Sequence, residues 1–137
     1  MKETPAELLA AVPQFAVEDV VRIAEYYRDI LDFQMAGYWD GQHRTLTPKA
    51  PPVFGIVHRD RVEVFFNRAT SPVARDSGGY HAYFHVKGID TLAREWRSRG
   101  AQILDGPEDM VYGQREVVIR DPNGLILAFG EARDESC

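Results

Sequence analysis

The sequence predicts an α+β domain built from two similar modules, each with the element order βαβββ. The first observation is an internal repeat, in which an offset of 69 places Val12 over His81 and keeps apolar residues aligned through the helix that follows. In the last strand of each half the offset is 63, and the run 62–66 falls over the run 125–129. The second observation is that strand and helix periodicities alternate in the same order in both halves.

The repeat sets the expected domain organisation. Residues 1–137 are expected to form a single domain, with module one at about 11–68, a linker at 69–79 and module two at about 80–131. The linker is rich in small and polar residues, as a surface connection should be. The sequence leaves open whether both modules stay together in one chain or are exchanged between two chains.

Each predicted element follows from its local pattern. Asp19 is placed to cap the first helix, whose apolar residues recur at spacings of three and four, and Gly100 is expected to end the second helix at 89–99. Tyr27 and Trp96 lie on these stripes and are expected in the core. A short helix is expected within 1–11 and a polar tail at 131–137. Strands are expected at 13–17, 33–39, 53–58, 62–67, 81–86, 102–104, 115–120 and 125–129.

Composition excludes several classes of protein. The chain is 45% hydrophobic and 27% charged, which suits a globular core, and no apolar run approaches the roughly 20 residues of a membrane span. A formal charge of −5 with scattered Lys and Arg residues gives no basic patch for nucleic acid. The single cysteine, Cys137, can form neither an internal disulfide nor a Cys-rich zinc site. We therefore expect a soluble cytoplasmic protein with no nucleic-acid or membrane partner.

Three segments carry a family resemblance: Glu18-Asp19-Val20, the run 26–33 (YYRDILDF), and Arg120-Asp121-Pro122-Asn123-Gly124 before the closing strand. Over about residues 11–131 the chain resembles the vicinal oxygen chelate superfamily. That superfamily groups glyoxalase I, extradiol dioxygenases, methylmalonyl-CoA epimerase, fosfomycin resistance enzymes and bleomycin resistance proteins. The resemblance implies a cupped mixed sheet (the glyoxalase/bleomycin resistance fold), ligand binding in the cup, and commonly a homodimer. Because an open cup exposes apolar sheet, a homodimer is also expected on physical grounds.

The resemblance also assigns four metal-ligand positions, here Val12, Phe65, His81 and Ala128. Only His81 carries a donor atom, and a divalent metal needs three or four donors. We therefore expect neither a metal nor another cofactor, and a protein closest in type to the metal-free bleomycin resistance-like members.

Strand alternation indicates which side chains line the cup, because every second residue shares a face. The opposite face, which includes Phe84, is expected to pack under the helices. The expected ligand-binding residues are Gln14, Trp39, Phe54, Glu63, Phe65, His81, Tyr83, His85 and Tyr112.

Two classes of function follow, with a third left open. The favoured one is a metal-free protein that sequesters an aromatic or cationic small molecule, with antibiotics as a candidate class. The alternative is a glyoxalase-like lyase, isomerase or dioxygenase. The third is metal-free acid/base catalysis by Glu63, His81 and His85, since an imidazole near a carboxylate titrates close to neutrality.

Overall fold

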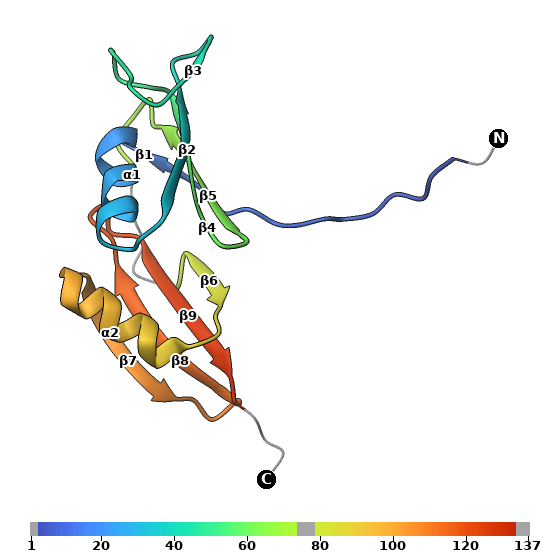
Figure 1. Ribbon diagram of the computed structural model, residues 1–137, viewed down its shortest axis with the longest axis vertical. Helices are drawn as coiled ribbons and strands as arrows, with labels where there is room; N and C mark the ends of the chain where they lie inside the picture. Colours follow the sequence, from blue (N-terminus) through green and yellow to red (C-terminus); the bar gives the residue numbers. More distant parts are fainter. Residues whose placement is uncertain (1–2, 74–78, 134–137) are drawn as a thin grey trace.

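The computed structural model describes residues 3–73 and 79–133 and contains two mixed sheets, each covered by one helix (Figure 1). The first sheet has the strand order β1-β5-β4-β2-β3 and the second has the order β6-β9-β8-β7. The pairs β1–β5 and β6–β9 are parallel, and the other paired strands are antiparallel. The elements are β1 (Gln14–Val17), α1 (Val20–Asp29), β2 (Gln34–Trp39), β3 (Arg44–Thr45), β4 (Phe54–Arg59), β5 (Val62–Arg68), β6 (Ala82–His85), α2 (Ile89–Arg99), β7 (Gln102–Asp109), β8 (Gln114–Arg120) and β9 (Ile126–Ala132).

This architecture confirms the predicted fold class and the repeated βαβββ order. The predicted single cupped sheet is wrong within one chain, however, because the strands form two separate hydrogen-bonded sheets. The predicted helix within 1–11 is wrong for its described part, because residues 3–13 form neither helix nor strand. The described residues do not include 74–78 of the expected linker or 134–137 of the expected tail, which contains Cys137. Within 3–73 and 79–133, no helix is long and apolar enough to cross a membrane.

Strand ends also differ from expectation. The strand predicted at 102–104 runs on to Asp109, because Gly106 and Pro107 are accommodated by register shifts in an edge strand. β3 was not predicted, and its two residues pair with the end of β2. β9 continues to Ala132, so Glu131 belongs to a strand and not to a tail. His81 lies just before β6 rather than within it.

Both helices begin where a carboxylate accepts backbone N–H groups. The Asp19 side chain accepts from the amide of Arg22 at 3.0 Å, as the sequence predicted. At α2 the carboxylate comes from the neighbouring sheet, since Glu131 accepts from the amides of Gly88 and Ile89, each at 3.0 Å. This second cap fixes the start of α2 against β9.

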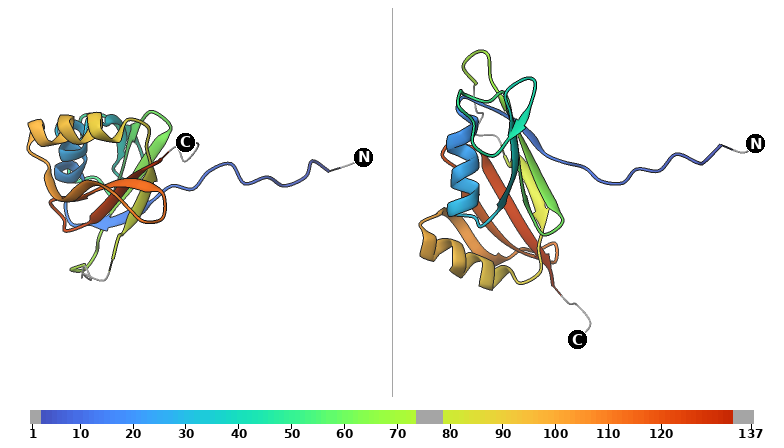
Figure 2. Two further views of the ribbon diagram at one scale, coloured as in Figure 1. Left: turned by 90° about the horizontal axis from the view of Figure 1, so that it is seen from below. Right: turned by 45° about the horizontal axis from the view of Figure 1, so that its top comes forward.

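The two modules share one core on their helix sides, and Figures 1 and 2 show both helices on the same side of the molecule. Tyr27 and Trp96 are each 1% exposed, which confirms their predicted burial. The Tyr27 hydroxyl donates to Asp121 Oδ2 at 2.9 Å, and Trp96 Nε1 donates to the carbonyl of Leu31 at 3.1 Å. Both bonds cross from one module to the other. They therefore fix the relative placement of the sheets and leave the faces opposite the helices uncovered by either helix.

We predict that Tyr27→Phe lowers the free energy of unfolding by about 1–3 kcal/mol, because the buried Asp121 carboxylate loses its donor from module one. Urea denaturation measures the change. Tyr80→Phe is the control, since Tyr80 is 51% exposed and the substitution should cost less than about 0.5 kcal/mol. Equal stability of the two variants would show that the hydrogen bond between Tyr27 and Asp121 does not stabilise the contact between the modules.

Candidate functional site

The open face of the first sheet carries a row of aromatic side chains. The rings of Trp39 and Phe54 meet edge to face with centroids 5.6 Å apart, and those of Phe54 and Phe65 do the same at 5.3 Å. Strand pairing sets the row, because Trp39 on β2 lies opposite Phe54 on β4. All three residues are half-buried, so ring surface remains exposed to solvent. The Arg44 guanidinium lies 5.9 Å from the centre of the Trp39 ring, at one end of this aromatic row.

The open face of the second sheet is organised around Glu116 on β8. The Tyr83 hydroxyl donates to Glu116 Oε2 at 2.7 Å, and the Tyr112 hydroxyl donates to the same oxygen at 2.6 Å. Tyr83 also lies 3.3 Å from Gln114 Oε1, so its shorter bond is to Glu116. Glu116 is 2% exposed, whereas Tyr83 and Tyr112 are 37% and 58% exposed. A buried carboxylate thus lies beneath two tyrosines that solvent can reach. We call Tyr83, Tyr112, Gln114 and Glu116 the Glu116 cluster.

One oxygen of this carboxylate has no hydrogen-bond partner in the part of the chain that the structure describes. Glu116 Oε1 is buried and accepts no hydrogen bond from any described residue. A buried charged oxygen without a donor is costly, by about 1–3 kcal/mol or more, unless another group supplies a proton or a positive charge.

Glu116 also controls the protonation of its two tyrosines. Burial, followed by the hydrogen bond to Glu116, raises the pKa of Tyr83 well above its ordinary value of 10.0. The hydrogen bond to Glu116 raises the pKa of Tyr112 to about 12. Both effects favour the neutral phenol, so the two tyrosines keep their donors at alkaline pH values at which an ordinary tyrosine ionises.

Gly130 on β9 makes room for this arrangement. A Cβ atom built at this position would lie 1.9 Å from the Tyr83 hydroxyl oxygen. The Tyr83 side chain therefore lies directly on the backbone of β9, and any larger residue at position 130 would displace it from Glu116.

The model of the Glyoxalase/Bleomycin resistance protein/Dioxygenase superfamily matches residues 10–129. The chain belongs to this superfamily. No curated protein matches the sequence.

Solved structures of superfamily type share the fold. A glyoxalase-related enzyme from Clostridium phytofermentans is 18% identical, with a TM-score of 0.72 over 95% of this chain and 99% of the other. The bleomycin-binding protein from Streptomyces verticillus, complexed with copper(II)-bleomycin, is 20% identical, with a TM-score of 0.66 over 96% and 100%. TnmS3, an antibiotic binding protein from Streptomyces sp. CB03234, is 16% identical, with a TM-score of 0.66 over 93% and 99%. At these identities the likeness establishes the fold alone.

The metal set that the resemblance assigns does not fit this chain. Phe65 pairs with Gln14, and Ala128 pairs with Tyr83 at the equivalent place in the second sheet. Phe65 and Ala128 carry no donor atom, and neither does Val12, which precedes β1. Among residues 3–73 and 79–133 no three His, Cys, Asp or Glu side chains lie together in a group that could hold a metal ion.

The three acid/base candidates lie on or beside strands of two different sheets, and among the described residues no hydrogen bond or ion pair joins Glu63 to His81 or His85. Glu63 is exposed on β5, whereas His85 is exposed on β6 of the other sheet, with its ring 5.5 Å from that of Tyr83. His81 Nδ1 accepts the amide of Ile126 at 2.9 Å, so this imidazole extends the pairing of β6 with β9. Gln14 is exposed on β1, next to β5.

Sequence reasoning missed Glu116 and Gln114. The signal was present, because alternation along β8 puts both on the face opposite Val117 and Ile119, and a carboxylate in a strand of Val and Ile is unusual. Tyr112 was included, but its contact with Glu116 depends on how the turn at 110–113 folds back on the sheet.

We predict that Glu116→Gln lowers the pKa of Tyr112 from about 12 toward the ordinary value of 10.0, because the negative acceptor becomes neutral. NMR of Cζ-labelled tyrosine at about pH 11 should show Tyr112 neutral in the wild type and mostly ionised in the variant. Glu63→Gln, on the other sheet, is the control and should leave this signal unchanged. A Tyr112 signal that is the same in all three proteins would exclude Glu116 as the cause.

Proposed function

We propose that the protein binds an aromatic small molecule with a cationic group, in a groove formed by the open faces of two copies. The observation that carries this proposal is the buried Glu116 carboxylate, whose Oε1 has no partner among the described residues. A ligand ammonium or guanidinium group would satisfy that oxygen with a charge-assisted hydrogen bond.

The aromatic row supports the apolar half of such a ligand. Trp39, Phe54 and Phe65 offer adjoining half-exposed rings, and planar molecules bind such surfaces by stacking and by burying apolar area. The formal charge of −5 favours a cation over an anion at long range. The aromatic row and the buried carboxylate together favour a ligand that has a planar ring system and a cationic group.

A second copy is proposed because the two halves of this site lie on separate sheets. The aromatic row belongs to the first sheet and the Glu116 cluster to the second. The helix sides of both modules are buried in their shared core and are not available to a ligand. A symmetric dimer can place module one of one copy opposite module two of the other, which completes two equivalent grooves. It would also cover the half-exposed aromatic surface.

The antibiotic-binding proteins of the same fold support antibiotics as the ligand class to test first. The glyoxalase-like lyase, isomerase or dioxygenase alternative has less support, because three of the four assigned metal positions lack donors. Sequestration requires no reacting groups, so the lack of a hydrogen bond or ion pair between Glu63 and either His81 or His85 among the described residues is compatible with the proposal.

Binding is tested by calorimetric titration of glycopeptide and anthracycline antibiotics. For a ligand that binds, Trp39→Ala or Phe54→Ala should weaken binding by about 1–3 kcal/mol through loss of stacking. Glu116→Gln should weaken a cationic ligand by a similar amount and its neutral analogue much less. Glu25→Gln, on the exposed face of α1, is the control. Unchanged affinity after both aromatic truncations would place the site elsewhere.

The dimer is tested separately by light scattering. At micromolar concentration we expect twice the 15.5 kDa mass of one chain. A monomer at this concentration, with ligand present, would contradict a shared groove.

A further inference from the structure

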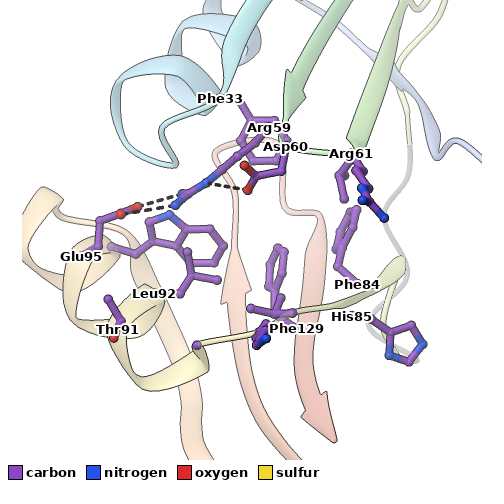
Figure 3. Close-up of a pocket in the computed structure, with 15 residues that line it drawn as sticks. Phe33, Arg59, Asp60, Arg61, Phe84, His85, Thr91, Leu92, Glu95 and Phe129 are labelled. Carbon is purple, nitrogen blue, oxygen red and sulfur yellow. Dashed lines mark hydrogen bonds and ion pairs between the residues drawn. The ribbon is translucent and has the colours of Figure 1, made fainter.

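A cavity lies between the modules, and His85 at its rim is the lining residue that it shares with the open face of the second sheet (Figure 3). Its volume is about 850 Å³, within the range of small-molecule sites. The turn between β4 and β5 forms one side, and β6 and α2 form the other. Its apolar walls consist of Phe33, Val62, Phe84, Leu92, Trp96 and Phe129.

The cavity exists because α2 does not cover its whole sheet. α2 packs against β7, β8 and β9, which leaves Phe84 of β6 facing the space below module one. The Phe84 and Phe129 rings are stacked, with centroids 4.8 Å apart and planes inclined by 11°. Trp96 meets Phe129 edge to face at 4.7 Å. These rings belong to the core, since Phe84 is 8% and Phe129 4% exposed, so only a small part of each ring reaches the cavity.

The charged residues that line the cavity are Arg59, Asp60, Arg61, Lys87 and Glu95, which leaves one net positive charge. Arg59 is already paired, since it donates to Glu95 Oε2 at 2.8 Å and to the carbonyl of Leu31 at 2.8 Å. Arg61 from module one and Lys87 from module two are both exposed, and neither forms an ion pair with another described residue. Figure 3 shows the Arg61 side chain beside Phe84. Lys87 is close enough to Glu131 to lower the pKa of that carboxyl group, but Glu131 is held by the first amides of α2. Two cations without an ion pair to a described residue, beside a largely apolar cavity, favour an anionic ligand with an apolar body.

We propose that this cavity binds an amphipathic aromatic carboxylate. The ring system would lie between the half-buried Val62 and Leu92, over the edge of the core at Phe84, and the carboxylate would bind Arg61 and Lys87 at the mouth. The start of α2 does not contribute to anion binding, because Glu131 already accepts from its first amides. This site takes a charge opposite to that preferred by the Glu116 cluster, so the two sites are distinguishable by ligand charge.

The test compares 2-naphthoate with 2-naphthamide, which has the same rings and no charge, by NMR titration of the ¹⁵N-labelled full chain. Naphthoate should shift the amide signals of Val62, Lys87 and Thr91, and naphthamide should bind about ten-fold more weakly. The double variant Arg61→Glu/Lys87→Glu should lose about ten-fold in naphthoate affinity. Arg22→Glu, an exposed charge reversal on α1, should leave it unchanged. Because the substituted residues are all exposed, the variants should fold.

Several results would overturn this inference. Equal binding of naphthamide, an unchanged affinity of the double variant, or no binding at millimolar naphthoate would each exclude a carboxylate site. Shifts confined to the open faces, at Phe54 and Tyr83, would move the ligand to the other site. A peptide of residues 3–11, with its acidic groups and two exposed leucines, is the competing occupant. If that peptide shifts the cavity signals and naphthoate does not, the cavity is a docking site for that segment.

Discussion

The buried hydrogen bond between Tyr27 and Asp121 is the constraint on which the rest of the structure depends. Asp121 Oδ1 accepts from the amides of Asn123 and Leu125, at 2.9 and 3.0 Å, and so shapes the turn before β9. Its Oδ2 accepts from Tyr27 of the other module. One carboxylate, 2% exposed, thus sets both the path into β9 and the docking of module one. Because this joint uses the helix sides, the opposite sheet faces are left for ligands or a second copy.

The repeat made the fold predictable, because periodicity reports which face of each element is buried. Helical spacing placed Tyr27 and Trp96 in the core, and alternation placed Trp39, Phe54 and Phe65 on one sheet face. The joint itself was not predictable from pattern. Tyr27 and Asp121 are 94 positions apart, and periodicity gives no information on which buried surfaces of two modules meet. For the same reason the sequence could not distinguish one sheet from two.

The contacts of the Glu116 cluster could not be predicted from local sequence patterns. Glu116 lies on a strand whose alternation was readable, but its pairing with Tyr83 and Tyr112 depends on the register of β8 with β9 and on the turn at 110–113. Gly130 illustrates the same limit, since its missing side chain matters only because Tyr83 lies across it. The cavity at Phe84 arises from an incomplete cover by α2, a packing outcome that no local pattern encodes. Its charge preference nevertheless follows directly from Arg61 and Lys87.

In the proposed dimer the aromatic row of one copy faces the Glu116 cluster of the other, and paramagnetic relaxation enhancement between copies measures that proximity. An unlabelled copy carries a nitroxide at Glu63→Cys, with Cys137→Ser to leave one attachment point, and is mixed with a ¹⁵N-labelled wild-type copy. If the proposed dimer forms, the amide signals of β8 and β9 around Glu116 and Gly130 in the labelled copy should broaden. Broadening confined to the helix side, or no broadening between copies, would contradict it.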